Sequence, residues 1–357
     1  MKITRIEAKR VPLDLTRPYT IAYKTVSAVE ICILEVETES GLLGLGAANP
    51  SPYVVGEDMD ACMAALAPDR VEKFLGRDVR DLRRLCQDLH ETYPENPGAK
   101  AALDLAFHDL FAQHLGVPLL TYLGQYHEKM ATSITIGIKN VADTLEEAQE
   151  YIDRQFKILK VKLGHSLEED LERLIKLRER FGAEIGIRVD ANQGYTTADL
   201  VHFHQATQAL KLELVEQPLP VGEEDAIRGL NWEIRKTIAA DESLVTADHA
   251  FQWVSDPKMC GIFNIKLMKC GGIYQAQRIA EAARFAECEL MWGCNDESII
   301  SITAALHVAF SCPHTRFIDL DGSLDLARDM VEGGFILEDG FMRPNGKPGL
   351  GLTYLGV

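Results

Sequence analysis

Three carboxylates in the second half of this chain stand where a parallel sheet would gather them. Asp190, Glu216 and Asp241 each directly follow a short apolar run, at intervals of 26 and 25 residues. If these runs are neighbouring strands, the carboxylates converge at one edge, where they would repel one another unless a divalent cation neutralised them. Ligation by oxygens suits Mg²⁺, with Mn²⁺ as the alternative. A single acidic residue after a strand is usually a helix cap or a surface group, but three in register favour a metal site.

Lysines flank this predicted metal site on both sides. Lys160 and Lys162 end the apolar run before Asp190, and Lys266 ends the run after Asp241. Alternation along a strand puts Lys160 and Lys162 on the same side. Either lysine alone is most simply the partner of a neighbouring carboxylate, because unpaired ammonium groups are rarely buried. Together the lysines place an amine at each face of a metal-bound substrate, which suits acid/base catalysis on opposite sides of one carbon.

Positioning these residues requires a regular series of strands, and the spacing supplies one. The polar residues at the ends of five successive runs are 28, 26, 25 and 25 residues apart, the length of one strand, one helix and two loops. A β/α unit repeated about eight times closes most simply into a parallel barrel, whose active site lies at the carboxyl ends of the strands. The expected strands are Ser133–Ile138, Ile158–Leu163, Ile185–Val189, Leu212–Val215, Ile238–Ala240, Gly261–Lys266, Glu289–Trp292 and Arg316–Asp319.

The first third of the chain has a different pattern. Residues 1–50 alternate apolar and polar side chains, with Ser40-Gly41 as a hairpin turn, and residues from about 58 to 123 change to a helical period. Strands followed by helices predict an α+β domain, which we place at residues 1–124. The barrel then takes residues 125–321, and the tail 322–357 packs back on the first domain. The predicted fold is α/β: a modified TIM-type (β/α) barrel with an N-terminal α+β capping domain completed by the C-terminal tail.

Composition excludes several classes of partner. Lys and Arg number 37 against 54 Asp and Glu, so the formal net charge is −17. Nucleic acids and anionic membranes demand a basic surface, and no run approaches the roughly 18 apolar residues of a membrane helix. The eight cysteines are scattered without a Cys-x-x-Cys pair, and the N-terminus lacks the apolar run of a signal peptide. These features predict a cytoplasmic protein with reduced thiols.

The constellation of lysines and carboxylates resembles the enolase superfamily, and within it the muconate-lactonizing subgroup. The resemblance covers essentially the whole chain, including the C-terminal Gly346–Gly351 run. Sites of this superfamily use lysine or histidine bases with Mg²⁺, so the resemblance implies that a proton next to a carboxylate moves through an enolate. It also implies that the metal ligands are Asp190, Glu216 and Asp241. The acid/base pair is then Lys162 and Lys266, and Lys160 assists Lys162.

A second motif narrows the resemblance. The last expected strand ends in Asp319-Leu320-Asp321, an Asp-x-Asp that looks like that of the dipeptide epimerases, where two carboxylates hold the α-ammonium group of the substrate. Alternation puts Asp319 and Asp321 on the same face, so both could contact one cation. An isolated Asp-x-Asp is commonly a pair of loop carboxylates, but its place at the end of the eighth strand favours the ammonium site. Thr135 on the first barrel strand also resembles a substrate-contacting position.

The implied function is a Mg²⁺-dependent dipeptide epimerase, which inverts the α-carbon of the C-terminal residue of an L,L-dipeptide by two-lysine 1,1-proton transfer. Asp296 stands where relatives that act on Ala-Glu tend to carry an apolar residue, and Lys24 where they have an arginine. Asp296 would favour a cationic side chain, whereas Lys24 could serve a glutamate or pair with Asp296. Cationic dipeptides, Ala-Glu and hydrophobic dipeptides all stay open. Leu45 and Ala47 replace the Trp and Glu of a common Gly-Trp-Gly-Glu stretch, with no consequence that the sequence assigns.

Other activities compete with this prediction. A cycloisomerase, an o-succinylbenzoate synthase or an N-acylamino acid racemase would use the same lysines but needs no ammonium site, so Asp319 and Asp321 disfavour them. A sugar-acid dehydratase usually places a histidine beyond the third ligand, where this chain has Lys266. A binding protein would not need two opposed bases. We therefore expect a small dipeptide as substrate, a homo-oligomer, and neither nucleic acid nor membrane as partner.

Overall fold

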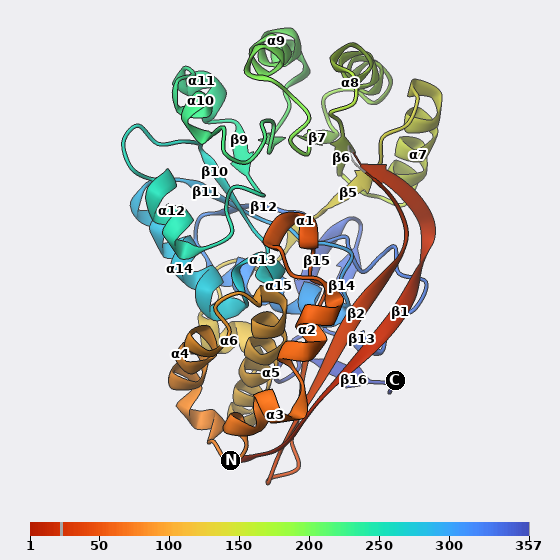
Figure 1. Ribbon diagram of the computed structural model, residues 1–357. Coiled ribbons are helices and arrows are strands. Elements are labelled where there is room, and N and C mark those ends of the chain that lie inside the picture. The colour runs from red at the N-terminus through yellow and green to blue at the C-terminus, as the bar shows by residue number, and fades with distance from the viewer. Residues whose placement is uncertain (22–23, 357) are drawn as a thin grey trace.

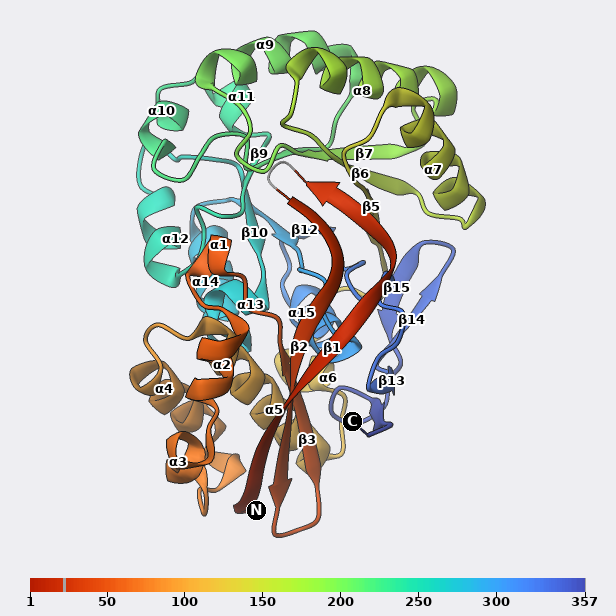
Figure 2. The ribbon, with the colours of Figure 1, turned by 45° about the vertical axis from the view of Figure 1, so that its right-hand side comes forward.

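A long antiparallel sheet forms the core of the N-terminal domain in the computed structural model, which describes residues 1–21 and 24–356, without the side chains of residues 21–24. The strands β1 (Ile3–Ile21), β2 (Lys24–Thr38) and β3 (Leu43–Ala48) pair in that order. Gly41, with a φ of 79°, makes the turn between β2 and β3, which confirms the expected hairpin. The β1–β2 ribbon rises to the barrel mouth (Figure 1 and Figure 2), where Thr20 O accepts a 2.8 Å hydrogen bond from Ile138 N.

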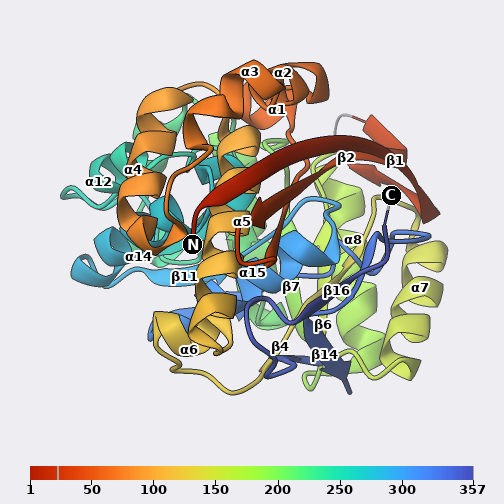
Figure 3. The same ribbon diagram turned by 90° about the horizontal axis from the view of Figure 1, so that it is seen from below.

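The N-terminal domain also contains helices, and some of them pack on this sheet (Figure 3). They are α1 (Pro52–Val55), α2 (Met59–Ala65), α3 (Pro68–Val71), α4 (Leu82–Thr92), α5 (Pro97–Leu115) and α6 (Leu119–Leu123), with the 3-10 turns η1 (Glu72–Phe74) and η2 (Val79–Asp81). The alanine-rich α5 lies so close to β3 that a Cβ on Gly46 would be 1.9 Å from Ala102 O. Leu45 and Ala47 are buried. Their departure from the family pattern is therefore a change of core side chains on β3.

Eight parallel strands form the barrel, in chain order around the sheet. They are β5 (Ser133–Ile136), β6 (Ile158–Lys162), β7 (Gly186–Asp190), β8 (Val215–Glu216), β9 (Ile238–Ala240), β10 (Ile262–Ile265), β11 (Glu289–Trp292) and β12 (Thr315–Ile318). A single parallel bridge between Thr132 and Ile318 brings β12 back to the first strand, so the barrel is nearly closed. All eight expected strands are present, and their ends differ from the predicted bounds by only a few residues.

Helical connections ring the barrel (Figure 1). They contain α7 (Val141–Asp153), α8 (Leu167–Phe181), α9 (Thr197–Thr207), η3 (Gln208–Leu210), α10 (Glu224–Arg228), α11 (Trp232–Arg235), α12 (Ala247–Trp253), α13 (Leu267–Cys270), α14 (Ile273–Phe285) and α15 (Ile299–Ser311). Side chains of Asn140, Ser166 and Thr196 cap α7, α8 and α9 by accepting from first-turn N–H groups. The expected eighth β/α unit is incomplete, because no described helix follows β12. None of the described helices is long and apolar enough to span a membrane.

The chain after β12 returns to the capping domain instead of forming a helix. β14 (Phe335–Glu338) and β15 (Phe341–Pro344) form a sheet with β4 (Met130–Ala131), and β13 (Val331–Gly333) pairs with β16 (Leu352–Tyr354). Leu350 N donates to Asp109 Oδ1 on α5 at 2.8 Å, and Tyr354 OH donates to Glu35 on β2. The tail therefore completes the N-terminal domain, as expected. The residue boundaries of the three segments stay predictions.

Side chains fill the barrel below its mouth. A separate buried cluster in the interior consists of Leu214, Ala239, Ile262, Met291 and Phe317. Arg188 crosses the interior and donates to Ile318 O at 2.6 Å and to Ser133 Oγ at 3.2 Å. Because residues two apart on a strand share a side, the next inward positions lie at the carboxyl ends of the strands. Those positions are Glu216, Asp241, Asn264, Gly293 and Asp319.

Candidate active site

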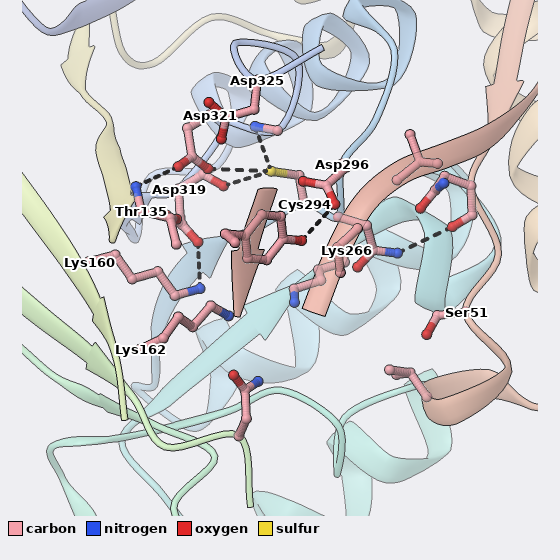
Figure 4. A pocket seen from close by; sticks show the side chains of 18 of the residues that line it. Ser51, Thr135, Lys160, Lys162, Lys266, Cys294, Asp296, Asp319, Asp321 and Asp325 are labelled. Carbon is pink, nitrogen blue, oxygen red and sulfur yellow. Dashed lines mark hydrogen bonds and ion pairs between the residues drawn. The ribbon is translucent and has the colours of Figure 1, made fainter. Parts of the chain in front are cut away.

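A cavity of about 470 Å³ opens at the carboxyl ends of the barrel strands and is also lined by residues of β1 and β2. Figure 4 shows the side chains that line it. The strand register aligns Lys162 with Asp190 and Asp190 with Glu216, so these residues meet at one level. Asp190 and Glu216 have no exposed surface, because they lie beneath the lysines at the inner end of the cavity. The structure therefore brings the predicted metal ligands and lysines together.

Lys160 stands at the centre of the buried charges. Its Nζ lies 2.7 Å from Glu216 Oε2, 2.7 Å from Asp319 Oδ2 and 3.4 Å from Asp190 Oδ2. Burial opposes its charge, but Asp319 and the two other carboxylates raise the pKa of Lys160 well above its ordinary value. Lys162 Nζ lies beside it and pairs with Asp190 Oδ2 at 2.7 Å. Lys160 is thus a fixed cation, which fits the expected supporting role.

Lys266 faces Lys162 from the other side of the barrel. The strands β6 and β10 are separated by β7, β8 and β9 in the eight-stranded sheet, so they form opposite walls. Lys266 Nζ lies 2.7 Å from Asp241 Oδ2. The amino groups of Lys162 and Lys266 point toward each other across the cavity (Figure 4). A substrate carbon between them has an amine on each side.

The three carboxylates share their charge unequally. Burial and the neighbouring Asp190 raise the pKa of Glu216 to about 8. Against the effect of burial, lysines lower the pKa of Asp190 and hold that of Asp241 well below its usual range. The lysines alone therefore support two charged carboxylates, and the third favours a proton at neutral pH.

The oxygens at the inner end of the cavity fit a hard divalent cation. Asn192 Oδ1 and Glu242 Oε2 are buried and have no hydrogen-bond partner among the described residues. Both residues line the cavity. Burial, followed by Asp241, raises the pKa of Glu242 to about 7. A surplus of buried carboxylate and amide oxygens suits Mg²⁺, whose shell waters complete the coordination. Asp190 and Asp241, with Glu216 between them, could therefore hold the cation.

A second group of possible metal ligands lies away from the cavity. Cys86, Asp104 and His108 are buried, and one ligand atom of each lies within 4.8 Å of the others. Asp104 Oδ1, however, accepts a hydrogen bond of 2.6 Å from Ile273 N at the start of α14. His108 Nδ1 lies 2.8 Å from Asp104 O. These contacts explain the group as a link between α5 and the barrel.

Asp319, the first carboxylate of the Asp-x-Asp motif, faces the buried lysine. Its Oδ2 pairs with Lys160 Nζ, and its Oδ1 accepts from Ser133 Oγ at 2.6 Å. Against burial, Lys160 lowers the pKa of Asp319 to about 2. Both oxygens thus have partners within the barrel. The predicted contact between Asp319 and a substrate ammonium group stays a prediction.

Asp321, the second carboxylate of the motif, faces the cavity. Its Oδ2 accepts from Thr135 N at 2.8 Å, and the Cys294 thiol lies 3.9 Å from its Oδ1. Asp321 is 5% exposed, and no described cation lies within ion-pair distance of it. Burial, with Asp319 and Asp325 adding to it, raises the pKa of Asp321 to about 7. Both carboxylates of the motif line the cavity, and Asp321 is the one without a described cation partner.

Asp296 lies on the outer wall of the cavity. Tyr19 OH, from β1, donates to Asp296 Oδ2 at 2.6 Å. Asp321 and Asp325 lie nearby on the same wall (Figure 4). The place of Asp296 in the cavity agrees with the expectation, while its effect on substrate choice stays a prediction. The side chain of Lys24 lies outside the described residues, so its expected role also stays a prediction.

Some residues of the site were not singled out in the sequence, Asn192 and Glu242 among them. Lys269 contacts both a carboxylate oxygen and the carbonyl of Asp241, and Asn264 Nδ2 donates to Glu216 Oε1 at 2.8 Å. Asp325 lines the outer cavity. The alternation of β10 could have identified Asn264, and a lysine one helical turn after another could have identified Lys269. Asp325 follows β12 in an irregular loop, and no pattern in the sequence places it.

Comparison with known proteins gives the family. Residues 5–124 match the model of the mandelate racemase / muconate lactonizing enzyme N-terminal domain, and residues 143–355 match the enolase C-terminal domain-like model. The chain belongs to the enolase superfamily.

Two relatives of this enolase-superfamily member are L-Lys-D/L-Arg epimerases. The one from Methylococcus capsulatus is 52% identical over 354 residues, with 99% of each chain covered. The one from Desulforapulum autotrophicum is 49% identical over 352 residues, with 99% of each chain covered. The crystal structure of the Methylococcus capsulatus dipeptide epimerase, complexed with Mg and the dipeptide L-Arg-D-Lys, has a TM-score of 0.98 at 52% identity and covers 99% of this chain and 100% of that chain. The predicted family and fold are confirmed.

Proposed function

We propose that this enolase-superfamily member is a Mg²⁺-dependent dipeptide epimerase that acts on cationic dipeptides. The observation that carries the proposal is the cavity, which has lysines on opposite walls at its inner end and carboxylates at its outer end. The L-Lys-D/L-Arg epimerases of about 50% identity support it. The reaction inverts the α-carbon of the C-terminal residue of an L,L-dipeptide.

Asp190, Glu216 and Asp241 would hold Mg²⁺, or Mn²⁺ in its place. The bound cation supplies a partner for the substrate carboxylate and stabilises the negative charge that develops beside it. Asn192 and Glu242 would offer further buried oxygens beside the cation. Lysine ion pairs occupy these carboxylates in the structure, and a cation would share those oxygens and release part of that pairing.

Lys162 and Lys266 move the proton of the α-carbon. One neutral amine removes the proton from its face of the carbon, and the other lysine, as an ammonium ion, returns a proton to the opposite face. Since the two lysines stand on opposite walls, each turnover inverts the carbon. The reverse reaction exchanges their roles. Lys160 assists by holding Glu216 and Asp319 through its ion pairs.

The outer end of the cavity binds the N-terminal residue of the dipeptide. Asp321 accepts the α-ammonium group, because it faces the cavity and has no described cation partner. Burial and the neighbouring Asp319 raise the pKa of Asp321, and an ammonium group bound beside it would favour the charged carboxylate. Thr135 fixes Asp321 through its backbone N–H. An N-acylated substrate or a cyclohexadiene acid lacks the ammonium group, which disfavours the racemase, synthase and cycloisomerase alternatives.

The charge of the outer wall favours cationic side chains over glutamate. Asp296 and Asp325 add two carboxylates beside Asp321, and a glutamate there would meet like charge. The L-Ala-D/L-Glu activity considered from the sequence is therefore the second candidate. Lys24 is the residue that would support it, if its side chain faced the substrate carboxylate.

A dipeptide panel tests the proposal. Purified protein is incubated with Mg²⁺ and L-Lys-L-Arg, L-Arg-L-Lys or L-Ala-L-Glu, and epimers are separated by chromatography. The cationic dipeptides should be epimerised with the higher kcat/KM, EDTA should abolish the reaction, and Mg²⁺ should restore it. An Asp190→Asn variant should bind Mg²⁺ more weakly by calorimetry. Full activity in metal-free protein, or no turnover of any dipeptide, would contradict the proposal.

Assembly and location belong to the proposal as well. The eight cysteines are free, and seven of them are buried, which suits the reducing cytoplasm expected from the sequence. A homo-oligomer stays a prediction that light scattering on the purified protein would test.

A further inference from the structure

Asp325 is a cavity residue that takes no part in the proposed proton transfer or in binding the α-ammonium group. It lies between β12 and the tail strands, and its carboxylate lines the outer end of the cavity. Its backbone holds the loop in place, because Thr16 N donates to Asp325 O at 2.8 Å and Leu15 pairs with Leu326. The side chain makes no ion pair or hydrogen bond with any described residue, so the fold does not depend on its charge.

The cations near Asp325 are engaged elsewhere. Arg17 Nη1 pairs with Glu147 Oε1 at 3.0 Å, and its Nη2 pairs with Glu150 Oε2 at 2.8 Å. Arg154, the other arginine near Asp325, pairs through Nη1 with Glu150 Oε1 at 3.7 Å. Lys139 Nζ pairs with the neighbouring Glu147 through Oε2 at 2.6 Å. Glu147 is thus fully matched by two cations, and Asp325 beside it is matched by none that the structure describes. Burial, followed by Asp296 and Glu147, raises the pKa of Asp325 to about 6.

Asp321 and Asp325 are therefore two neighbouring cavity carboxylates with no described cation partner. Asp321 is 5% exposed and faces the cavity, so its charge requires a cation from the substrate. The N-terminal residue of a cationic dipeptide carries two positive groups on one α-carbon, the ammonium group and the side chain. With the ammonium group on Asp321, the side chain leaves the same α-carbon and can extend along the wall that carries Asp325.

We infer that Asp325 is a specificity-determining residue that binds the cationic side chain of the N-terminal residue of the dipeptide. This inference rests on the proposed function. It assigns the choice of the two substrate side chains to different residues, which the sequence alone could not do. Asp325 selects the side chain of the N-terminal residue, and Asp296 selects that of the C-terminal residue. The ligand chemistry is an ammonium or guanidinium group at the end of a flexible aliphatic chain.

Matched dipeptides that differ only in the N-terminal residue test the inference. L-Arg-L-Lys, L-Ala-L-Lys and L-Glu-L-Lys are compared by kcat/KM in the wild type and in Asp325→Asn. The variant should lose about 10- to 100-fold on L-Arg-L-Lys, because a charge-assisted contact is removed. It should lose less than about 3-fold on L-Ala-L-Lys and should gain on L-Glu-L-Lys, since repulsion is relieved.

A control variant makes the same chemical change outside the cavity. Asp248→Asn, at an exposed position in the first turn of α12, should leave all three values unchanged. The gain on L-Glu-L-Lys cannot come from damaged folding, so it keeps the test informative if Asp325→Asn is less stable. An equal loss on L-Arg-L-Lys and L-Ala-L-Lys, or no loss on either, would overturn the inference. Failure of the wild type on all three dipeptides would instead overturn the proposed function.

Discussion

The two ends of the cavity treat charge in opposite ways. At the inner end, Lys160 contacts three carboxylates and Lys266 pairs with Asp241, so buried charges of both signs neutralise one another. At the outer end, Asp321 and Asp325 have no described cation partner, and their carboxyl pKa values are raised to about 7 and about 6. The inner residues are therefore held by their own ion pairs, whereas the outer carboxylates have no described cation partner and fit a cationic ligand.

Removing Lys160 should break the inner end most severely. Lys160→Met leaves the charged Asp319 buried without its lysine partner, and breaking a buried ion pair costs about 3–5 kcal/mol. Urea denaturation in EDTA should show this loss, and epimerisation should fall by at least about 10²-fold, as when a proton-transfer site is disordered. Lys157→Met, an exposed lysine on the same segment, should change neither value. A Lys160→Met protein of wild-type stability would show that the inner ion pairs do not hold the site.

Removing the charge of Asp321 should affect the outer end without affecting the fold. Asp321→Asn keeps the shape but loses a charge-assisted contact to an ammonium group, worth about 1.5–3 kcal/mol in kcat/KM. N-acetylation of the dipeptide should reduce turnover by the wild type at least as much. Equal turnover of acetylated and free dipeptides would contradict the ammonium site and would favour an N-acylamino acid racemase or a cycloisomerase.

Asp296 should give a smaller effect, confined to the C-terminal side chain. The ratio of kcat/KM for L-Ala-L-Lys to that for L-Ala-L-Glu should exceed one in the wild type and fall by about 10-fold in Asp296→Ile. Tyr19→Phe is the matched control, because it removes the 2.6 Å hydrogen bond to Asp296 but leaves the charge of Asp296 in place. A wild type that prefers the glutamate dipeptide, or a lysine preference that survives Asp296→Ile, would remove Asp296 from substrate selection.

The smallest expected effect is that of Asp325→Asn on stability. This variant should be more stable than the wild type at pH 7, whereas Lys160→Met should be less stable. The pKa of Asp325 is raised from 3.8 to about 6, chiefly by burial, so the folded protein holds this proton more tightly than the unfolded chain does. Its stabilising contribution is therefore largest at low pH and is lost as the pH rises through this window. Asp325→Asn should match the wild type at pH 4 and be more stable by about 1 kcal/mol at pH 7, after solvent screening. Denaturation midpoints across this pH range would show it, and a variant less stable at pH 7 would contradict it.

Local patterns in the sequence predicted most of the inner end. Strand alternation and the β/α period identified Lys162, Asp190, Glu216, Asp241 and Lys266 and placed all eight strands, because these features repeat along the chain. The period could not show that the last unit lacks its helix. That difference arises because the tail after β12 pairs with the capping domain, and such contacts between distant segments leave no periodic signal.

Long-range contacts also explain what the sequence missed within the site. Asp319, whose contact with an ammonium group stays a prediction, also pairs with Lys160, 159 residues earlier in the chain, because the barrel closes. Asp325 reaches the cavity because its loop pairs with β1, at the opposite end of the sequence. The sequence shows that Asp319 and Asp325 are carboxylates, but it does not show what each of them contacts. Asp319 and Asp321 both line the cavity, and only the fold shows that Asp319 also pairs with a lysine whereas Asp321 has no described cation partner.

The central claim is that two opposed lysines each serve one face of the α-carbon. Deuterium exchange tests this claim most directly. L-Arg-L-Lys and L-Arg-D-Lys are each incubated in D₂O with Mg²⁺ and either Lys162→Ala or Lys266→Ala, and the α-proton of the C-terminal residue is followed by NMR. Neither variant should epimerise, and each should exchange the α-proton of one epimer only, with the two variants acting on different epimers. Exchange of the same epimer by both variants, or epimerisation at the wild-type rate by either, would contradict the account.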